Sequence, residues 1–328
     1  MDTPCVEYAM TKTVLVTGGA GFISSHLEDL LVKDNNDVIS VDVLDPNECS
    51  NIRHLMEYDN FHYVKMDVKR IDDLTGVTKE CDIIYHLAAN SDIRVGGQDP
   101  SVDFNETFLT TRSVLESMRI NSIPNLFFSS TSAIYGNMVG KLNEITGGYE
   151  PISYYGASKL GSEALISAYS FMNDFNALIF RFPNVVGPRL THGVVFDFIR
   201  KLKKNPSKLL ILGDGRQCKQ YVYVSDLVEA INDFCNKMDS GYNLYNISTE
   251  SFTDVNTIAD LVTKRLGLEN VHYEYTGKKC GWKGDVPSFD YDVTKAKNKG
   301  WRYKYNSTES VKETLNNLDI NSIPPMDD

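Results

Sequence analysis

Apolar residues along this chain occur in short runs that alternate with longer stretches of helical spacing. The short runs predict buried strands at residues 12–17, 37–42, 61–66, 82–89, 126–131 and 177–182. Helical patterns follow the first run and recur at residues 102–119 and 154–173. Strands that alternate with helices over this length predict an α/β fold of the Rossmann type, with a doubly wound parallel sheet.

The regular alternation ends after Pro183. Short strands are expected at residues 208–212 and 220–224, and helices at 226–237 and 253–266, separated by loops rich in Pro, Gly and aromatic residues. We therefore expect a Rossmann domain over residues 12–182, to which parts of 220–250 return. A smaller α/β substrate lobe over residues 183–320 should cover the carboxyl ends of the sheet, where such folds bind ligands. Residues 1–11 and 321–328 are expected to be flexible ends.

A glycine-rich segment joins the first strand to the first helix. Gly18 and Gly21 stand in this segment, and Ser24 occupies the position of a third glycine. Glycines in such a turn let the backbone approach a pyrophosphate, which then rests on the N–H groups of the helix. Asp42 ends the next strand, 42 − 18 = 24 residues after the first glycine. An acid there accepts from a ribose 2′-hydroxyl and favours NAD over NADP, although a strand-end aspartate can also simply cap a loop.

A tyrosine and a lysine stand four residues apart at the start of the helix at 154–173. Tyr155 and Lys159 project from one helical face, and Thr131 ends the preceding strand. A nearby ammonium group is expected to lower the pKa of the tyrosine and stabilise its phenolate. With a hydroxyl to hold the substrate oxygen, the trio could act as a general acid and base for oxidising an alcohol or reducing a ketone.

The spacing of this pair is weak on its own. The chain also contains Tyr8 with Lys12 and Tyr275 with Lys279, and such pairs are usually solvated neighbours or chance occurrences. The middle pair alone follows an apolar strand that ends in hydroxyl groups. That context, together with the glycine turn, favours a catalytic role.

Composition and charge narrow the classes of function. The 328 residues are 42 % hydrophobic and 23 % charged, which is ordinary for a globular enzyme, and the formal net charge of −11 argues against nucleic acid as a partner. No segment has the roughly 20 apolar residues of a membrane span. Six cysteines without a C-x-x-C pair favour reduced thiols and a cytoplasmic protein.

His86 lies in an apolar strand and is interpreted as a packed residue, since no second His or Cys keeps metal-ligand spacing with it.

Seven segments of the chain resemble the extended short-chain dehydrogenase/reductase family. They are residues 17–23, 86–89, 129–136, 155–160, 181–189, 213–217 and 284–287. The resemblance extends from about residue 12 to 318, in the order of the family. The nearest branch is that of the nucleotide-sugar epimerases, the UDP-glucose 4-epimerases in particular.

The resemblance implies a role for each matching position. Tyr155 would be the base, Lys159 its partner and a ligand of the nicotinamide ribose, and Thr131 the hydroxyl beside the sugar O4. The implied NAD-binding residues are Gly18, Gly21, Phe22, Ile23, Asp42, Asp67, Val68, Leu87, Ala88, Ala89, Asn105, Tyr155 and Lys159. The implied substrate-binding residues are Ser132, Asn184, Arg189, Lys219 and Asp285. The resemblance implies no metal.

The residues after Thr131 favour one reaction among those of the family. Relatives that dehydrate sugars carry carboxylates there, whereas this chain has Ser132 and Ala133. The expected function is an NAD-dependent 4-epimerase that interconverts UDP-glucose and UDP-galactose, or their N-acetyl forms, through a 4-keto intermediate. A nucleotide-sugar reductase or dehydrogenase of the same fold and a non-enzymatic dinucleotide sensor remain as alternatives.

Three departures from the family pattern affect binding. Ser24 replaces the third glycine, Lys219 stands where many relatives carry an arginine for the diphosphate, and Pro183 could reshape the sugar pocket. A lysine lacks the bidentate geometry of arginine. The helices at 102–119 and 154–173 could also form a symmetric four-helix contact, so a homodimer is expected.

Overall fold

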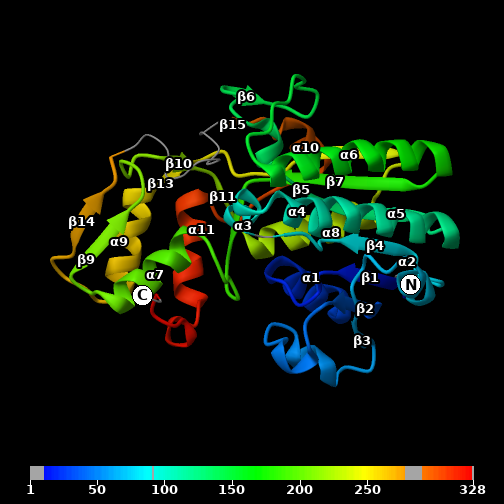
Figure 1. Cartoon of the computed structure of the whole chain (residues 1–328), viewed down its shortest axis with the longest axis horizontal. Coiled ribbons are helices and arrows are strands. Elements are labelled where there is room, and N and C mark those ends of the chain that lie inside the picture. The colour runs from blue at the N-terminus through cyan, green and yellow to red at the C-terminus, as the bar shows by residue number, and fades with distance from the viewer. Residues whose placement is uncertain (1–10, 91, 278–289, 327–328) are drawn as a thin grey trace, which may run out of the picture.

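A parallel sheet of seven strands forms the centre of the larger domain (Figure 1). The structure is a computed structural model and describes residues 11–90, 92–277 and 290–326. The strand order is β12-β7-β5-β4-β1-β2-β3. The bounds are β1 Thr13–Thr17, β2 Asp37–Asp42, β3 Phe61–Lys65, β4 Ile83–His86, β5 Asn125–Thr131, β7 Asn176–Phe182 and β12 Tyr242–Asn246. This arrangement confirms the expected α/β fold of the Rossmann type.

Helices cover both faces of the sheet, so apolar residues at the centres of its strands are buried on both sides. The helices are α1 Phe22–Lys33, α2 Ile71–Val77, α4 Pro100–Asp103, α5 Thr110–Asn121, α6 Tyr154–Asn173 and α8 Val224–Asn236. Alternate residues of β1 enter opposite layers: Val14 and Val16 pack with residues of α1 and α8, whereas Leu15 packs with residues of α2, α5 and α6.

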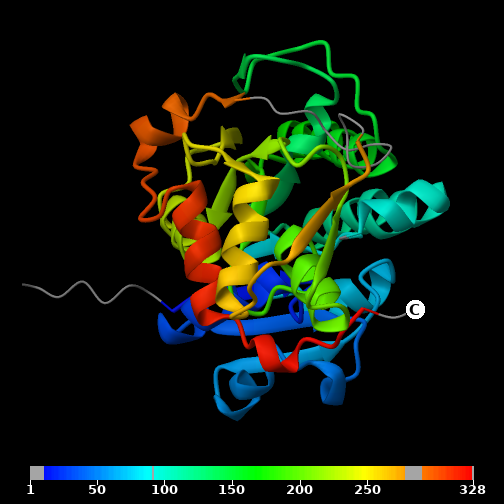
Figure 2. The same ribbon diagram turned by 90° about the vertical axis from the view of Figure 1, so that its left-hand side faces the viewer.

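The second lobe lies beyond the carboxyl ends of the strands (Figure 2). It contains α7 Val194–Lys204, α9 Val255–Arg265 and α11 Ser307–Asn317 around a third apolar cluster. Its strand pairs are β9 Lys208–Ile211 with β14 His272–Tyr275, β8 Asn184–Val186 with β11 Tyr221–Tyr223, and β10 Cys218–Lys219 with β13 Thr253–Asp254. The sequence interpretation did not predict α7 and α11.

Shorter elements complete the chain. They are η1 Pro46–Glu48, η2 Arg53–Glu57, α3 Ile93–Gln98, η4 Ser132–Tyr135, α10 Thr294–Lys299, η5 Ile320–Ser322, and the strand pair β6 Lys141–Leu142 and β15 Asp290–Tyr291. Near the C-terminus, Ile323 is buried and the Met326 N–H donates to the carbonyl of Arg200 in α7 at 3.1 Å. Within the described residues, no helix has the length and apolar character needed to cross a membrane.

The helix expected at residues 102–119 is interrupted. A π-helical segment, η3 Phe104–Leu109, lies between α4 and α5. The hydroxyl of Thr107, inside this segment, accepts from the backbone N–H of Asn90 at 3.3 Å. This hydrogen bond connects the π-helical segment to the loop that follows β4. Such segments are often found at functional sites.

Candidate active site

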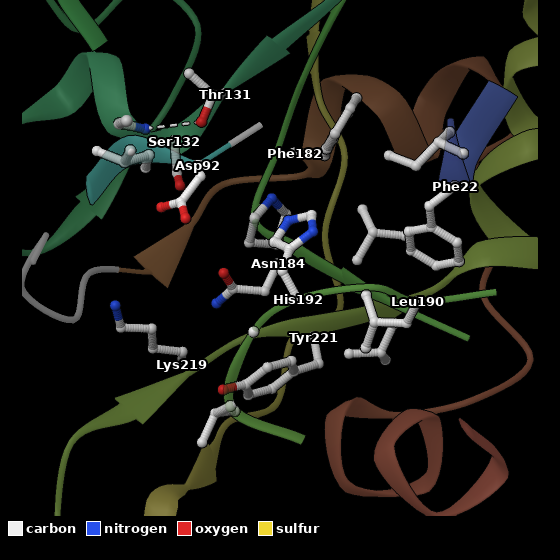
Figure 3. A pocket seen from close by; sticks show the side chains of 18 of the residues that line it. Phe22, Asp92, Thr131, Ser132, Phe182, Asn184, Leu190, His192, Lys219 and Tyr221 are labelled. Carbon is white, nitrogen blue, oxygen red and sulfur yellow. Dashed lines mark hydrogen bonds between the residues drawn. The ribbon is translucent and has the colours of Figure 1, made fainter. Parts of the chain in front are cut away.

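One continuous cavity of about 690 Å³ lies between the carboxyl ends of the central strands and the second lobe (Figure 3). Most of the site residues expected from the sequence line it. They are Gly18, Gly21, Phe22, Ile23, Asp42, Leu87, Ala88, Ala89, Thr131, Ser132, Tyr155, Lys159, Asn184 and Lys219. Residues far apart in the sequence thus meet at the edge of the sheet where α/β folds bind ligands.

Four expected site residues are not part of this lining. Asp67 lies 3.6 Å from the ammonium of Lys69, and Val68 is buried in the apolar core. Asn105 belongs to the π-helical segment η3. The guanidinium of Arg189 turns to α1, where its Nη2 lies 2.8 Å from Asp29 Oδ2. Their binding roles stay predictions, and Asp285 lies outside the described residues.

The glycine turn after β1 packs closely against the backbone that follows β4, which requires a residue without a side chain at Gly18. Gly18 has φ +69°, and a Cβ there would lie 2.9 Å from the Cα of Ala88. At the start of α1, no described side chain caps the free N–H groups, and the first turn contains no acidic residue. These N–H groups, with the positive end of the helix dipole, are suited to an anion such as a pyrophosphate.

Asp42 occupies the end of β2, beside this turn. Its Oδ2 accepts from the backbone N–H of Ala20 at 3.2 Å, and its Oδ1 accepts from the N–H of Leu44 at 3.2 Å. Both bonds fix the carboxylate at the edge of the cavity. It is therefore placed to accept from hydroxyl groups of a bound ribose.

Thr131 and Tyr155 come together from the end of β5 and the start of α6. Ser153 caps α6 by accepting from the N–H of Gly156 at 3.1 Å, so the helix begins just before Tyr155. Burial raises the pKa of Tyr155 to about 12; a hydrogen bond with Thr131 lowers it, and the charge of Asp103 raises it further. Without ligands, the phenol therefore holds its proton at neutral pH.

Lys159 is almost completely buried one turn further along α6. Its Nζ donates to the carbonyl of Ser129 at 2.6 Å and lies 6.0 Å from the ring centroid of Tyr155. Burial lowers the pKa of Lys159 to about 7, against the charge of Glu163, which raises it. The expectation that Lys159 lowers the pKa of Tyr155 is not met in this structure, because desolvation outweighs the attraction of a lysine that bonds elsewhere.

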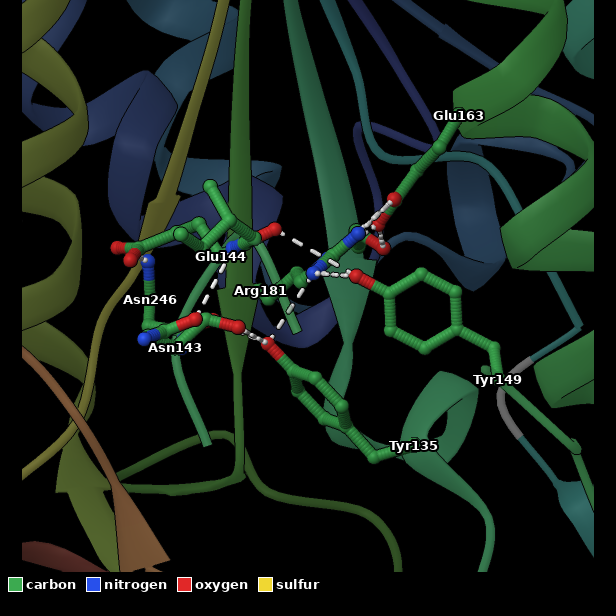
Figure 4. Close-up of polar contacts among 9 residues, drawn as sticks. Tyr135, Asn143, Glu144, Tyr149, Glu163, Arg181 and Asn246 are labelled. Atoms are coloured by element: carbon green, nitrogen blue, oxygen red, sulfur yellow. Dashed lines mark hydrogen bonds and ion pairs between the residues drawn. The ribbon is translucent and has the colours of Figure 1, made fainter. Parts of the chain in front are cut away.

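A buried ion pair lies one turn further along α6 than Lys159, and Figure 4 shows its two side chains. Glu163, the next residue on the same face of α6, is 2.6 Å from Arg181 of β7, and the two side chains are 4 % and 3 % exposed. Glu163 also accepts from the hydroxyl of Ser130, the neighbour of the carbonyl that holds Lys159. The guanidinium donates to the hydroxyls of Tyr135 at 3.1 Å and Tyr149 at 3.0 Å. The pair therefore joins β5, β7 and α6 to the loop that precedes α6.

His86 is a packed residue within the sheet, as its sequence context indicates. Its Nδ1 lies 2.7 Å from the hydroxyl of Thr17 and its Nε2 lies 3.0 Å from the hydroxyl of Thr111. Burial and the charge of Lys159 lower its pKa to about 3. The Thr17 hydroxyl also accepts from the N–H of Ala88 at 3.2 Å, so the neutral ring supports the wall of the cavity indirectly.

The sequence interpretation missed a polar group in the lining of the cavity. It consists of Asp92, Arg94, His192, Asp197 and Lys201. Asp92 caps α3 by accepting from the N–H of Arg94 at 2.9 Å. Asp92 lies in the loop before α3 and His192 in the loop before α7, whereas the other three lie in α3 and α7, and no motif marks any of them in the sequence.

Comparison with known proteins identifies relatives along almost the whole chain. The NAD dependent epimerase/dehydratase family matches residues 14–248. An uncharacterized UDP-glucose epimerase of Bacillus subtilis, YtcB, is 31 % identical over 313 residues, which cover 93 % of this chain and 96 % of that protein. A UDP-glucuronate 4-epimerase of Thermodesulfobacterium geofontis is 27 % identical over 313 residues, covering 92 % and 94 %. The crystal structure of a UDP-galactose 4-epimerase is similar with a TM-score of 0.79 and 35 % identity, covering 93 % of this chain and 98 % of that one.

Proposed function

The chain belongs to the NAD dependent epimerase/dehydratase family, and from this premise we propose that it is a UDP-sugar 4-epimerase. It would interconvert UDP-glucose and UDP-galactose, or the N-acetyl forms, through a 4-keto intermediate. The observation that supports this most is the placement of Thr131, Tyr155 and Lys159 in one cavity with the glycine turn of Gly18.

The described residues fit NAD. The uncapped start of α1 and the turn at Gly18 suit the pyrophosphate, and Asp42 suits the adenosine ribose. When bound, NAD supplies a reversible acceptor for the hydrogen on the sugar C4. Leu87, Ala88 and Ala89 would form the wall that excludes water from the cofactor.

The chain itself supplies the proton chemistry. Tyr155 would take the O4 proton during oxidation and return it during reduction, while Thr131 holds the same oxygen. The raised pKa of Tyr155 suits the return of the proton but opposes its removal. The positive charge of Lys159, one turn away, is the group on this helix that would favour removal. Lys159 would meet this need if it exchanged its bond to Ser129 for one near the phenol.

The lobe would hold the nucleotide while the keto sugar turns over. Asn184 and Lys219 line the cavity on the lobe side, and Ser132 lines it next to Thr131. Anchoring the nucleotide lets its binding energy support chemistry at the sugar. The segment Thr131–Ser132–Ala133 offers no carboxylate of its own for dehydration.

Proton NMR of UDP-galactose in D2O tests the proposal. We expect the purified protein, supplied with NAD, to convert UDP-galactose to UDP-glucose without deuterium on the sugar carbons, because the same hydrogen returns to C4. Deuterium next to a carbonyl would contradict this mechanism and favour an enolisation. Free exchange of the bound cofactor with bulk NADH during turnover would favour a reductase.

We further propose that the protein is a homodimer formed through α6. Ala157, Gly161, Ala164 and Ala168 follow one another along one helical face, at spacings of four, three and four residues, and none is classed as buried. A Cβ at Gly161 would lie 3.2 Å from the ring of Phe108, and Phe104, whose ring stacks on that of Phe108, is 51 % exposed. Small residues would let a second copy of α6 approach closely around a two-fold axis.

Sedimentation equilibrium measures the oligomeric state directly. We expect twice the chain mass of 36.9 kDa at working concentrations. Ala164→Arg should give a monomer, because a long charged side chain would then occupy the centre of the contact. The substitution Asn316→Arg, at an exposed position of α11 in the second lobe, is the matched control. A wild-type mass near 37 kDa would remove the dimer.

A further inference from the structure

The cavity contains a carboxylate on the side of the reacting centre. Asp92 lines the cavity together with Thr131 and Ser132. In Figure 3 its carboxylate lies on the same side of the cavity as these two hydroxyls. Since Thr131 and Tyr155 mark the position of the sugar C4 in the proposed function, a group on this side would contact the sugar rather than the nucleotide.

Hydrogen bonds from Arg94 fix the carboxylate of Asp92 in place. Its Oδ1 accepts from the N–H of Arg94 at 2.9 Å, and the guanidinium reaches its two oxygens at 3.2 and 3.3 Å. These hydrogen bonds lower the pKa of the Asp92 carboxyl, although partial burial opposes them. The side chain is therefore an anion at neutral pH, with lone pairs left for the hydroxyl groups of a ligand.

The cations on the same wall are already engaged. Arg94 directs Nε and Nη2 to Asp92, and its Nη1 lies 3.9 Å from Asp197. Lys201 donates to the carbonyl of Leu210 at 2.9 Å. Burial lowers the pKa of His192, which leaves its ring neutral at pH 7. Apart from Lys159 beside Tyr155, this wall thus offers a ligand an acceptor and little positive charge.

We infer that Asp92 is a specificity-determining residue, whose carboxylate accepts hydrogen bonds from a neutral hexose and disfavours a uronic acid. The inference rests on the proposed function, because it places the sugar beside Thr131. In a uronic acid, C5, the neighbour of C4, carries a carboxylate in place of a CH2OH group. Two carboxylates at one site repel each other, whereas a hydroxyl group donates to the first. Binding sites commonly discriminate between similar ligands by placing a repulsive group where the disfavoured ligand would bind.

The substitution Asp92→Asn separates this role from the structural one. Asparagine caps a helix as well as aspartate does, so α3 and the melting temperature should be preserved. Only the charge is lost, and the guanidinium of Arg94 becomes available to a carboxylate. Asp99→Asn is the matched control, because Asp99 caps α4 in the same way, through the N–H of Ser101, and is exposed outside the cavity lining.

Calorimetric titration of the NAD-loaded protein with UDP-glucose, UDP-glucuronate and UDP provides the readout, independent of turnover. We expect the Kd of the wild type for UDP-glucose to be lower than its Kd for UDP-glucuronate by a factor of about ten or more. Asp92→Asn should remove most of that preference. Asp99→Asn should keep the wild-type ratio. Equal wild-type affinities, or an unchanged ratio in Asp92→Asn, would overturn the inference and leave the 4-epimerase proposal standing. If neither sugar nucleotide binds, the proposed function fails, and the inference with it.

Discussion

Tyr155→Phe is expected to lower kcat for the epimerisation of UDP-galactose by about 10²–10⁴-fold, the usual contribution of a general acid/base. The phenylalanine ring fills the same space on α6, but the proton of the sugar O4 then has no acceptor. Thr131 can still hold the oxygen, so KM should change much less than kcat. Initial rates over a range of UDP-galactose concentrations measure both constants.

The neighbouring tyrosine provides a control on the same helix. Tyr154 is 52 % exposed, and Tyr154→Phe removes a hydroxyl of the same kind without touching the cavity lining. This variant should retain the wild-type rate. Full turnover by Tyr155→Phe would show that another group moves the proton, and the assignment of the base would be wrong.

Glu163→Gln is expected to destabilise the fold by about 3–5 kcal/mol, the usual cost of breaking a buried ion pair from one side. The reason is that Arg181 would keep its charge at a site that is 3 % exposed, with no carboxylate to balance it. Urea unfolding, followed by tryptophan fluorescence, measures the loss in the free energy of unfolding.

Two further variants separate the charge from the packing. In Glu163→Met/Arg181→Met both charges disappear together, and buried pairs replaced by apolar residues often lose little stability. The double variant should therefore be more stable than Glu163→Gln alone. Asp73→Asn removes an exposed partner, since the Asp73 and Arg70 side chains are 44 % and 72 % exposed, and should change stability much less. If Glu163→Gln unfolds at the same urea concentration as Asp73→Asn, the buried pair does not stabilise the fold.

The strands and the glycine turn could be predicted because each follows from local chemistry. Burial on both faces gives β1 and β5 apolar runs at residues 14–16 and 126–128, and the backbone at Gly18 has φ +69° next to Ala88. The pair Tyr155 and Lys159 was identified by its spacing and by the strand before it. For the strands and the turn, the signal lies within a few residues of the feature that it predicts, whereas the interpretation of Tyr155 and Lys159 also needed the strand and the glycine turn earlier in the chain.

Features that depend on the packing of distant segments could not be predicted in this way. Asp92 and His192 reach the cavity from loops in different parts of the chain, with no periodicity to mark them. Arg189 stands in a recognisable segment, but its direction depends on Asp29 of α1. The pKa of Tyr155 rises because the surrounding structure removes water, which a spacing of four residues does not reveal.

The position of β12 has a consequence for synthesis on the ribosome. β12, Tyr242–Asn246, pairs with β7, Asn176–Phe182, although the whole stretch from residue 183 to 241 lies between them in the chain. While the protein is being made, β7 emerges first and stays an unpaired, mostly apolar edge until residue 246 has been added. Exposed strand edges can pair with strands of other chains. The nascent protein is therefore prone to aggregation from the time β7 emerges until β12 has been made. A prematurely terminated chain that ends between residues 183 and 241 would remain in that interval permanently, as an aggregation-prone fragment.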